Sequence, residues 1–198
     1  MNQDSQDKWS NYRSELIFSD FCISADFNVD IPALIQECRT SQNLQLSKNR
    51  SNVGGWQSQV YTSTSKKNLN HLQQMVLEFS LGSIQKEGFE VTRNRSAWWI
   101  NINNNESYNV IHTHGRSDVI GIFYLSIPKN AGELEILRND GMTYTSLRTN
   151  RNARLSSLYS VNPEVSKFYM FPGHVWHHVK QSYHTEDRIS LSYNIEFQ

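Results

Sequence analysis

The stretch RISLSYNIEF at residues 188–197 decides the fold, because apolar and polar side chains alternate along it. The apolar positions are Ile189, Leu191, Tyr193, Ile195 and Phe197. The positions between them are Ser190, Ser192, Asn194 and Glu196. Successive side chains of a strand point to opposite faces, so one face of this strand packs and the other is polar. Because Arg188 begins the polar face, we place that face inside the mouth of a barrel and the apolar face against helices.

Between residue 89 and this strand, the chain consists of short runs. These runs are rich in β-branched and aromatic residues, and turn clusters at 103–105, 129–132 and 139–141 separate them. Such spacing is typical of an antiparallel barrel or sandwich.

Two helices are expected before residue 89. Asp30 is a suitable cap, and Pro32 lies in the first turn of a helix from 31 to about 39. A second helix, over 68–86, ends before Gly88. It buries a stripe of residues three or four apart, Leu69, Leu72, Val76 and Phe79. We expect one domain over 1–198, with a helical support in 1–88 and a β core in 89–198.

The composition limits the classes of protein to which the chain can belong. The 198 residues are 37% hydrophobic, which excludes a disordered chain, and 19 basic residues balance 19 acidic ones. No overall field therefore attracts nucleic acid or an anionic membrane, and Arg138, Arg148, Arg151 and Arg154 are expected in a solvated excursion. Without an apolar run or a signal peptide, the chain is expected to be cytoplasmic. Cys22 and Cys38 are expected to be reduced and buried, and exposed strand edges are consistent with a homodimer.

Histidines provide the chemistry. His112 and His114 are two residues apart, so in a strand they face the same way and can reach one metal ion. Imidazole suits iron, zinc and copper, and three protein ligands with open positions indicate a site meant for chemistry. His177 and His178 would face opposite ways, so only one of them can join the site. His71 and His184 are expected at the surface.

Arg188 lies eleven residues after His177. Its planar guanidinium can hold a carboxylate through two parallel hydrogen bonds, and Ser190 lies on the same face of the strand. The sequence therefore predicts a metal site with an anion clamp beside it.

Six segments, in this order, resemble the iron(II) and 2-oxoglutarate dependent oxygenases, in particular small ones from marine bacteria and phages. They are SNVGGWQS (51–58), WWIN (98–101), YNVIHTH (108–114), GIFYLSIPKNAGELE (121–135), FPGHVWHHV (171–179) and DRISLSYNI (187–195). The resemblance implies a mainly β fold with backing helices, a double-stranded β-helix of the jelly-roll, cupin-like kind. It implies iron(II) on His112 and His177, and 2-oxoglutarate held by Arg188 and Ser190.

The chain departs from the family pattern at His114, where most members carry Asp or Glu. Either His114 is the second ligand, or Asp118 supplies a carboxylate if the chain turns back at Gly115. Three neutral imidazoles would leave the metal site more positive than a site with a carboxylate. The metal and the use of 2-oxoglutarate both depend on this position.

Three further residues have roles only by resemblance. Tyr124 either bonds the cosubstrate carboxylate or is a core tyrosine. Asn101 either lines the pocket or closes a strand ladder, and Trp56 either covers the site as a lid or anchors a loop. At least one of Trp98 and Trp99, which face opposite ways, is expected to be ordinary packing.

The resemblance implies an enzyme that uses dioxygen to hydroxylate a small molecule or a protein side chain, releasing succinate and carbon dioxide. One alternative is a three-histidine iron dioxygenase that does not use 2-oxoglutarate. A second is a non-catalytic barrel that binds a metal or a ligand, and a third is a zinc hydrolase.

Overall fold

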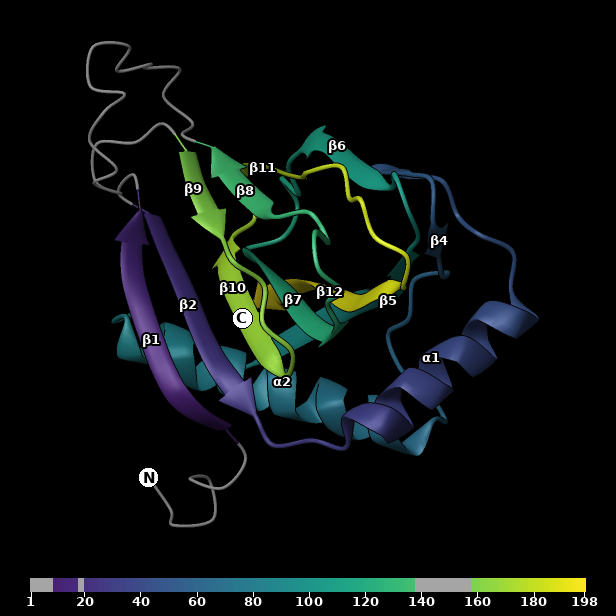
Figure 1. The fold of residues 1–198 in the computed structure, drawn as a ribbon. Helices are drawn as coiled ribbons and strands as arrows, with labels where there is room; N and C mark the ends of the chain where they lie inside the picture. Colours follow the sequence, from purple (N-terminus) through teal and green to yellow (C-terminus); the bar gives the residue numbers. More distant parts are fainter. Residues whose placement is uncertain (1–8, 18–19, 138–157) are drawn as a thin grey trace, which may run out of the picture.

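Two antiparallel β-sheets face each other in this computed structural model, which describes residues 9–17, 20–137 and 158–198, and two helices cover the outer face of the larger sheet (Figure 1). In spatial order the larger sheet contains β1 (Trp9–Ile17), β2 (Asp20–Phe27), β10 (Lys167–Pro172), β7 (Val119–Ser126), β12 (Arg188–Phe197), β5 (Asn94–Asn103) and β4 (Trp56–Gln57). The smaller sheet contains β3 (Asn52–Val53), β6 (Tyr108–His112), β11 (Trp176–Val179), β8 (Leu134–Leu137) and β9 (Leu158–Val161).

From β5 onward the chain crosses repeatedly between the sheets. β5, β7, β10 and β12 join the larger sheet, while β6, β8, β9 and β11 join the smaller one. Consecutive strands therefore wind around a common axis, which is the double-stranded β-helix, or jelly roll. The predicted fold class, mainly β with backing helices, is confirmed.

The helices begin where the sequence predicts them. In α1 (Ile31–Leu44) the Asp30 side chain accepts a hydrogen bond from the Ala33 amide, as an N-cap does. This helix continues five residues beyond the predicted end at Arg39, and Ser41 in the added turn is buried. α2 (Lys67–Lys86) ends before Gly88, whose φ of 93° suits glycine.

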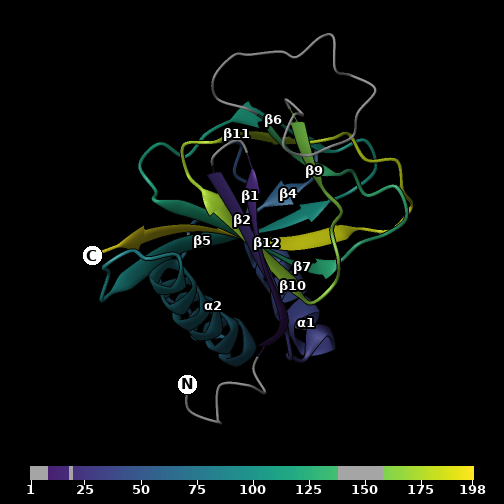
Figure 2. The same cartoon turned by 90° about the vertical axis from the view of Figure 1, so that its left-hand side faces the viewer.

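The apolar face of β12 packs toward these helices, as predicted. Ile189, Leu191 and Tyr193 share one buried core with the α2 stripe of Leu69, Leu72, Val76 and Phe79. A second core lies between the two sheets and includes Ile120, Ile122, Leu134 and Ile136. Seen from the side in Figure 2, both helices lie below the larger sheet. The polar face of β12 is therefore turned toward the space between the sheets.

The first 88 residues contain more than helices. β1 and β2 extend the larger sheet, and β2 pairs with β10 about 140 residues later, for example Ala25 with Phe168. Ile23, Ala25 and Phe27 alternate in the core, but only the distant partner strand makes that alternation a sheet. The turn cluster 139–141 and the four arginines at 138, 148, 151 and 154 lie outside the described residues.

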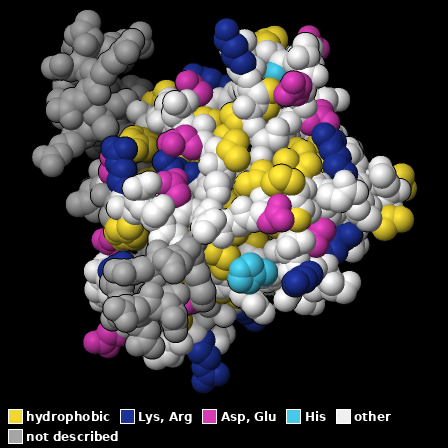
Figure 3. Space-filling model, turned by 60° about the horizontal axis from the view of Figure 1, so that its bottom comes forward, with side chains coloured by type: hydrophobic (Ala, Val, Ile, Leu, Met, Phe, Trp, Pro, Cys, Tyr) yellow, Lys and Arg dark blue, Asp and Glu magenta, His cyan; other side chains and the backbone are white. Residues whose placement is uncertain are grey.

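One face of the molecule matches the balanced charge of the chain. On the face that Figure 3 shows, basic and acidic side chains are interspersed. Cys22 and Cys38 are both free and buried, as predicted. Neither of the helices in the described ranges is long and apolar enough to cross a membrane.

Gly121 in β7 gives a test of the core. A Cβ there would overlap the ring of Phe168, which is fully buried and cannot move aside. We expect Gly121→Ala to lower the free energy of unfolding by ~1–3 kcal/mol, as overpacking does. Urea denaturation measures this.

Gly82→Ala is the matched control, because nothing lies within 4 Å of a Cβ at that position in α2. Alanine should stabilise this helix by up to ~1 kcal/mol. Equal stability of the two variants would contradict the packing described for β7.

Candidate active site

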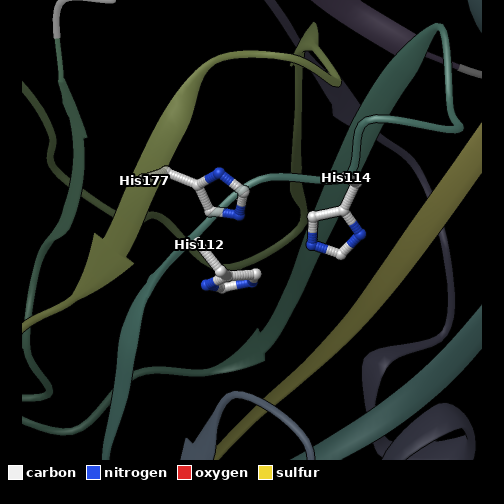
Figure 4. Close-up of side chains that lie close together, drawn as sticks. All are labelled: His112, His114 and His177. Atoms are coloured by element: carbon white, nitrogen blue, oxygen red, sulfur yellow. The ribbon is translucent and has the colours of Figure 1, made fainter.

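Three imidazoles meet between the two sheets (Figure 4). His112 ends β6 and is the register partner of His177 on β11, so both side chains lie on one face of the smaller sheet. His114 follows in the loop after β6. One ring nitrogen from each histidine lies within 4.8 Å of the others, and the ring centroids are 4.3 to 5.3 Å apart. The histidine cluster predicted from the sequence is therefore formed.

The loop that carries His114 is held by backbone contacts. The His114 amide donates to the Gly173 carbonyl at 2.8 Å, and the Gly173 amide donates to the Asp118 carbonyl at 2.9 Å. A Cβ at Gly173 would collide with the Ser117 carbonyl, so only glycine permits this close approach. The FPG segment before His177 thus also fixes His114.

Hydrogen bonds orient two of the three rings. Nδ1 of His112 lies 2.7 Å from the Val110 carbonyl, and Nδ1 of His177 lies 3.0 Å from the Val175 carbonyl. A carbonyl can only accept, so Nδ1 carries the hydrogen in both rings and Nε2 offers a lone pair. That tautomer is the one a metal ion requires when it binds through Nε2.

Burial keeps the cluster neutral. It lowers the pKa of His112, and it lowers the pKa of His114 to about 4 and that of His177 to about 3. The neighbouring imidazoles add to the fall in the last two cases, because a second positive charge nearby is unfavourable. Near neutral pH all three rings are in the form that binds metal.

These pKa values predict an acid-sensitive metal-free protein. In the unfolded chain a histidine binds a proton near pH 6.5, whereas folded His114 does so only near pH 4. The unfolded state therefore takes up protons first, and stability falls as pH drops from about 6.5 toward 4. For His114 alone we expect a loss of roughly 1–2 kcal/mol between pH 7 and pH 5, measurable by urea denaturation.

His114→Gln should make that pH dependence less steep, while His112 and His177 still contribute. His71→Gln, on the exposed side of α2, should leave it unchanged. A stability that does not vary between pH 7 and pH 5 would refute the buried, neutral state of the cluster.

A guanidinium lies in the same cavity as the histidines. Arg188, at the start of β12, is only 3% exposed, and its Nε has no hydrogen-bond partner among the described residues. One of its terminal nitrogens lies 3.4 Å from the Tyr124 hydroxyl. The guanidinium and the three imidazoles line one cavity. Its polar lining comprises Ser51, Asn101, Asn103, Asn109, Ser190, Ser192, Arg188 and the three histidines.

A family model described as "Putative 2OG-Fe(II) oxygenase" matches residues 97–194, a span that includes the three histidines and Arg188. The chain belongs to the 2OG-Fe(II) oxygenases. Its cofactors are accordingly iron(II) and 2-oxoglutarate, which confirms the cofactor prediction.

Solved structures of such oxygenases share the fold at low sequence identity. A Pseudomonas putida prolyl-4-hydroxylase is 15% identical with a TM-score of 0.62, over 98% of this chain and 95% of that one. HygX from Streptomyces hygroscopicus, with nickel and 2-oxoglutarate bound, is 10% identical with a TM-score of 0.58, over 88% and 82%. The carbocyclase SnoK of nogalamycin biosynthesis is 10% identical with a TM-score of 0.63, over 89% and 79%. The search of curated protein sequences found no match to the chain.

The side chains of this oxygenase fit both cofactors. Three neutral imidazoles are suitable donors for iron(II), and the unpartnered Nε of Arg188 is a buried donor that requires an acceptor. A carboxylate of 2-oxoglutarate would provide that acceptor. The metal-binding cluster and the guanidinium line one cavity, so a single small dianion could reach both.

The oxygenase fold separates Asp118 from the histidines. The Asp118 carboxylate accepts a hydrogen bond from the Phe197 amide at 2.7 Å, and it lines a different cavity together with Phe21 and Ile84. The chain does turn after Gly115, with the Ser117 amide donating to the His114 carbonyl. That turn directs Asp118 toward the end of β12, so only His114 joins the cluster.

The structure also places the residues suggested by resemblance. Ser190 is the register partner of both Asn101 and Tyr124 and lines the cavity. Asn101 lines it too, and its Nδ2 donates to the Ser192 Oγ at 2.9 Å. Tyr124 is fully buried beneath Arg188, whose Cζ lies 5.2 Å from the ring centre. Tyr124 therefore contacts the guanidinium directly.

Some aromatic and histidine predictions are now decided. Trp99 stacks on His114 with centroids 5.8 Å apart and 9° between the planes, whereas Trp98 is buried in the core near the helices. Trp99 pairs with Ser192 on the polar face of β12, a register that the sequence alone does not show. Trp56 packs against that core, donating to the Gln45 carbonyl, and is not a lid.

His184 is 7% exposed, so its predicted surface position was wrong. Its backbone amide donates to the Asn105 Oδ1 at 3.2 Å, which holds this segment against the loop after β5.

Proposed function

We propose that the chain is a 2-oxoglutarate dependent iron(II) dioxygenase that hydroxylates a small molecule or a protein side chain. His112, His114 and His177 would hold the iron, and Arg188 with Ser190 would bind the far carboxylate of 2-oxoglutarate. One observation carries this proposal: the three imidazoles and the unpartnered Arg188 Nε line the same cavity.

Charge supports this assignment. Three neutral ligands leave the two positive charges of iron(II) uncompensated, and Arg188 adds a third nearby. 2-Oxoglutarate carries two negative charges, so its binding would neutralise most of this excess. A carboxylate ligand at position 114 would have weakened that attraction. The three-histidine site therefore favours a dianionic cosubstrate.

When bound, iron(II) and 2-oxoglutarate supply the activation of dioxygen, with succinate and carbon dioxide as products and one oxygen atom available to a C–H bond of the substrate. The chain's own residues orient the cofactors and shield the site from water. Tyr124 contacts the Arg188 guanidinium and holds it in place, and Asn101 fixes the Ser192 hydroxyl at the cavity wall.

The remaining wall is apolar and excludes water. Ile120, Ile122, Leu134 and Val179 line the same cavity. Exclusion of water strengthens the electrostatic contacts inside such a site and protects reactive species from side reactions. Hydroxylation is proposed because the Pseudomonas putida neighbour, which covers nearly the whole chain, is a hydroxylase. The identity of the substrate depends on the cavity lining, which includes amides and hydroxyls such as Asn103, Asn109 and Ser51.

An anaerobic titration tests the proposal. Purified apo protein receives iron(II) and then 2-oxoglutarate, and the visible charge-transfer band of a chelated keto acid is recorded. We expect a band in the wild type and a weaker one in His114→Ala and Arg188→Ala. Under air, succinate should form with 2-oxoglutarate consumed.

The control is Asp118→Asn, which leaves the histidine cluster intact and should keep the band. Iron binding without any band would refute the use of 2-oxoglutarate. The absence of iron binding would refute the oxygenase chemistry altogether.

A further inference from the structure

Asn194 lies on the same face of β12 as the residues of the cavity. Ser190 and Ser192 line the cavity, and Asn194 is the next residue on that face. Its register partner on β7 is Ile120, whose side chain also lines the cavity. Direct partners in an antiparallel sheet place their side chains on the same face. The Asn194 side chain therefore faces the histidines. Along β12 it lies six residues away from Arg188.

The carboxamide of Asn194 has an unused acceptor. Its Oδ1 is buried and makes no hydrogen bond to any described residue. A buried acceptor without a partner is unfavourable, so a donor is expected to approach it when the site is filled. His114 is the candidate donor, because one nitrogen of its ring is on the side of β12 (Figure 4).

The three histidines differ in how their outer nitrogens are held. Backbone carbonyls of Val110 and Val175 hold Nδ1 of His112 and His177. No backbone carbonyl of the described residues does this for His114. In Figure 4 one nitrogen of the His114 ring faces the other two rings, and the second faces the gold ribbon of β12. The strand that carries Asn194 is thus on the side where an acceptor is missing.

We propose that Asn194 is a positioning residue for the metal site: its Oδ1 accepts a hydrogen bond from Nδ1–H of His114 and so directs Nε2 of that ring to the metal. This inference rests on the proposed function, in which His114 is a ligand. All three rings would then be held by the same device, a fixed oxygen on Nδ1. Such partners outside the ligand set commonly change metal affinity by about 10–100-fold.

The side chain is suited to this task. A carboxamide accepts without adding negative charge, so the site keeps the excess positive charge that favours 2-oxoglutarate. Trp99 stacks on the His114 ring and restricts its tilt, while a hydrogen bond would restrict its rotation. Two contacts of different kinds would then fix a ligand that comes from a loop rather than from a strand.

The first test is the tautomer of His114 in the metal-free protein near pH 7, read from the ¹⁵N shifts of the ring nitrogens. His112 and His177 serve as internal references for Nδ1–H. We expect the proton of His114 on Nδ1 as well. A proton on Nε2 of His114 would overturn the proposal, and this measurement requires no variant.

The second test is cobalt(II) affinity together with the visible spectrum of the bound ion. Asn194→Ala should lower the affinity about 10–100-fold and change the tautomer of His114. Asn194→Asp keeps an acceptor oxygen and should retain both the tautomer and tight binding. Asn94→Ala removes a different asparagine, bonded to the Leu77 carbonyl near α2, and should leave both unchanged.

Unchanged affinity and tautomer in Asn194→Ala would overturn the positioning role. A wild-type protein that binds no cobalt would instead refute the proposed function, because that result does not depend on Asn194. The tautomer measurement and the binding measurement thus separate the two failures.

Discussion

Replacement of His177 by alanine is expected to abolish iron binding at micromolar protein concentrations. His177 is the most buried of the three histidines, at 4% exposed, and it lies directly opposite His112. Its removal leaves two nitrogen donors and a polar void that water can enter. Loss of an outer partner costs about 10–100-fold in metal affinity, and loss of a ligand should cost more than that. Isothermal titration with iron(II) under anaerobic conditions measures the change.

His178→Ala is the matched control for this variant. The two histidines are adjacent, but His178 points to the other face of the smaller sheet, where its Nε2 lies 2.9 Å from the buried Glu135 carboxylate. The control loses that contact, and with it some stability, but it keeps all three ligands. We therefore expect unchanged iron affinity in His178→Ala. If His177→Ala bound iron as tightly as the control, the three-histidine site would be wrong.

The second large effect is expected for Arg188→Met. Methionine is similar in length and apolar, so it removes the charge and the donors while filling much of the space. Truncation of one partner of a buried, hydrogen-bonded charge pair costs ~2–5 kcal/mol. The affinity for 2-oxoglutarate should therefore fall between about 30-fold and several thousand-fold. Iron affinity should stay within a few-fold of the wild type, because Arg188 is not a ligand.

Tyr124→Phe tests the Tyr124 hydroxyl separately from the charge of Arg188. It keeps the ring beneath Arg188 and removes only the hydroxyl, which lies 3.4 Å from the guanidinium. We expect a reduction of a few-fold in 2-oxoglutarate affinity, since one neutral hydrogen bond contributes ~0.5–1.5 kcal/mol. If Arg188→Met bound 2-oxoglutarate as tightly as the wild type, Arg188 would have no role in binding the cosubstrate.

Histidine rather than a carboxylate at position 114 affects which anions the site binds. A carboxylate at this position would offset one positive charge of the iron, whereas an imidazole leaves it in place. The site should therefore prefer dianions over monoanions more strongly than a site with two histidines and a carboxylate. His114→Asp would test this preference directly, with 2-oxoglutarate and a monocarboxylic 2-keto acid compared on each protein.

Local sequence was sufficient for much of the architecture. The alternation in 188–197 predicted both faces of β12, because strand geometry alone assigns successive side chains to opposite sides. The helical stripe from Leu69 to Phe79 predicted the buried face of α2 for the equivalent reason. Both properties depend only on neighbours along the chain. The spacing of two residues also predicted that His112 and His114 share a strand face, but His114 lies in the loop after β6, where its amide donates to the distant Gly173 carbonyl.

Long-range pairing decided the rest. The register of β11 against β6 sets His177 opposite His112, and a turn held by Gly173 sends Asp118 away from the cluster. Pairing of β12 with β7 brings Asn194 level with Ile120. A residue's own sequence context states which face it occupies, but not which strand will lie beside it. That choice is made by the packing of whole sheets, whose free energy depends on residues far apart in the chain. The sequence therefore determined the residue types of the site and their faces, and only the tertiary structure determined which of them meet.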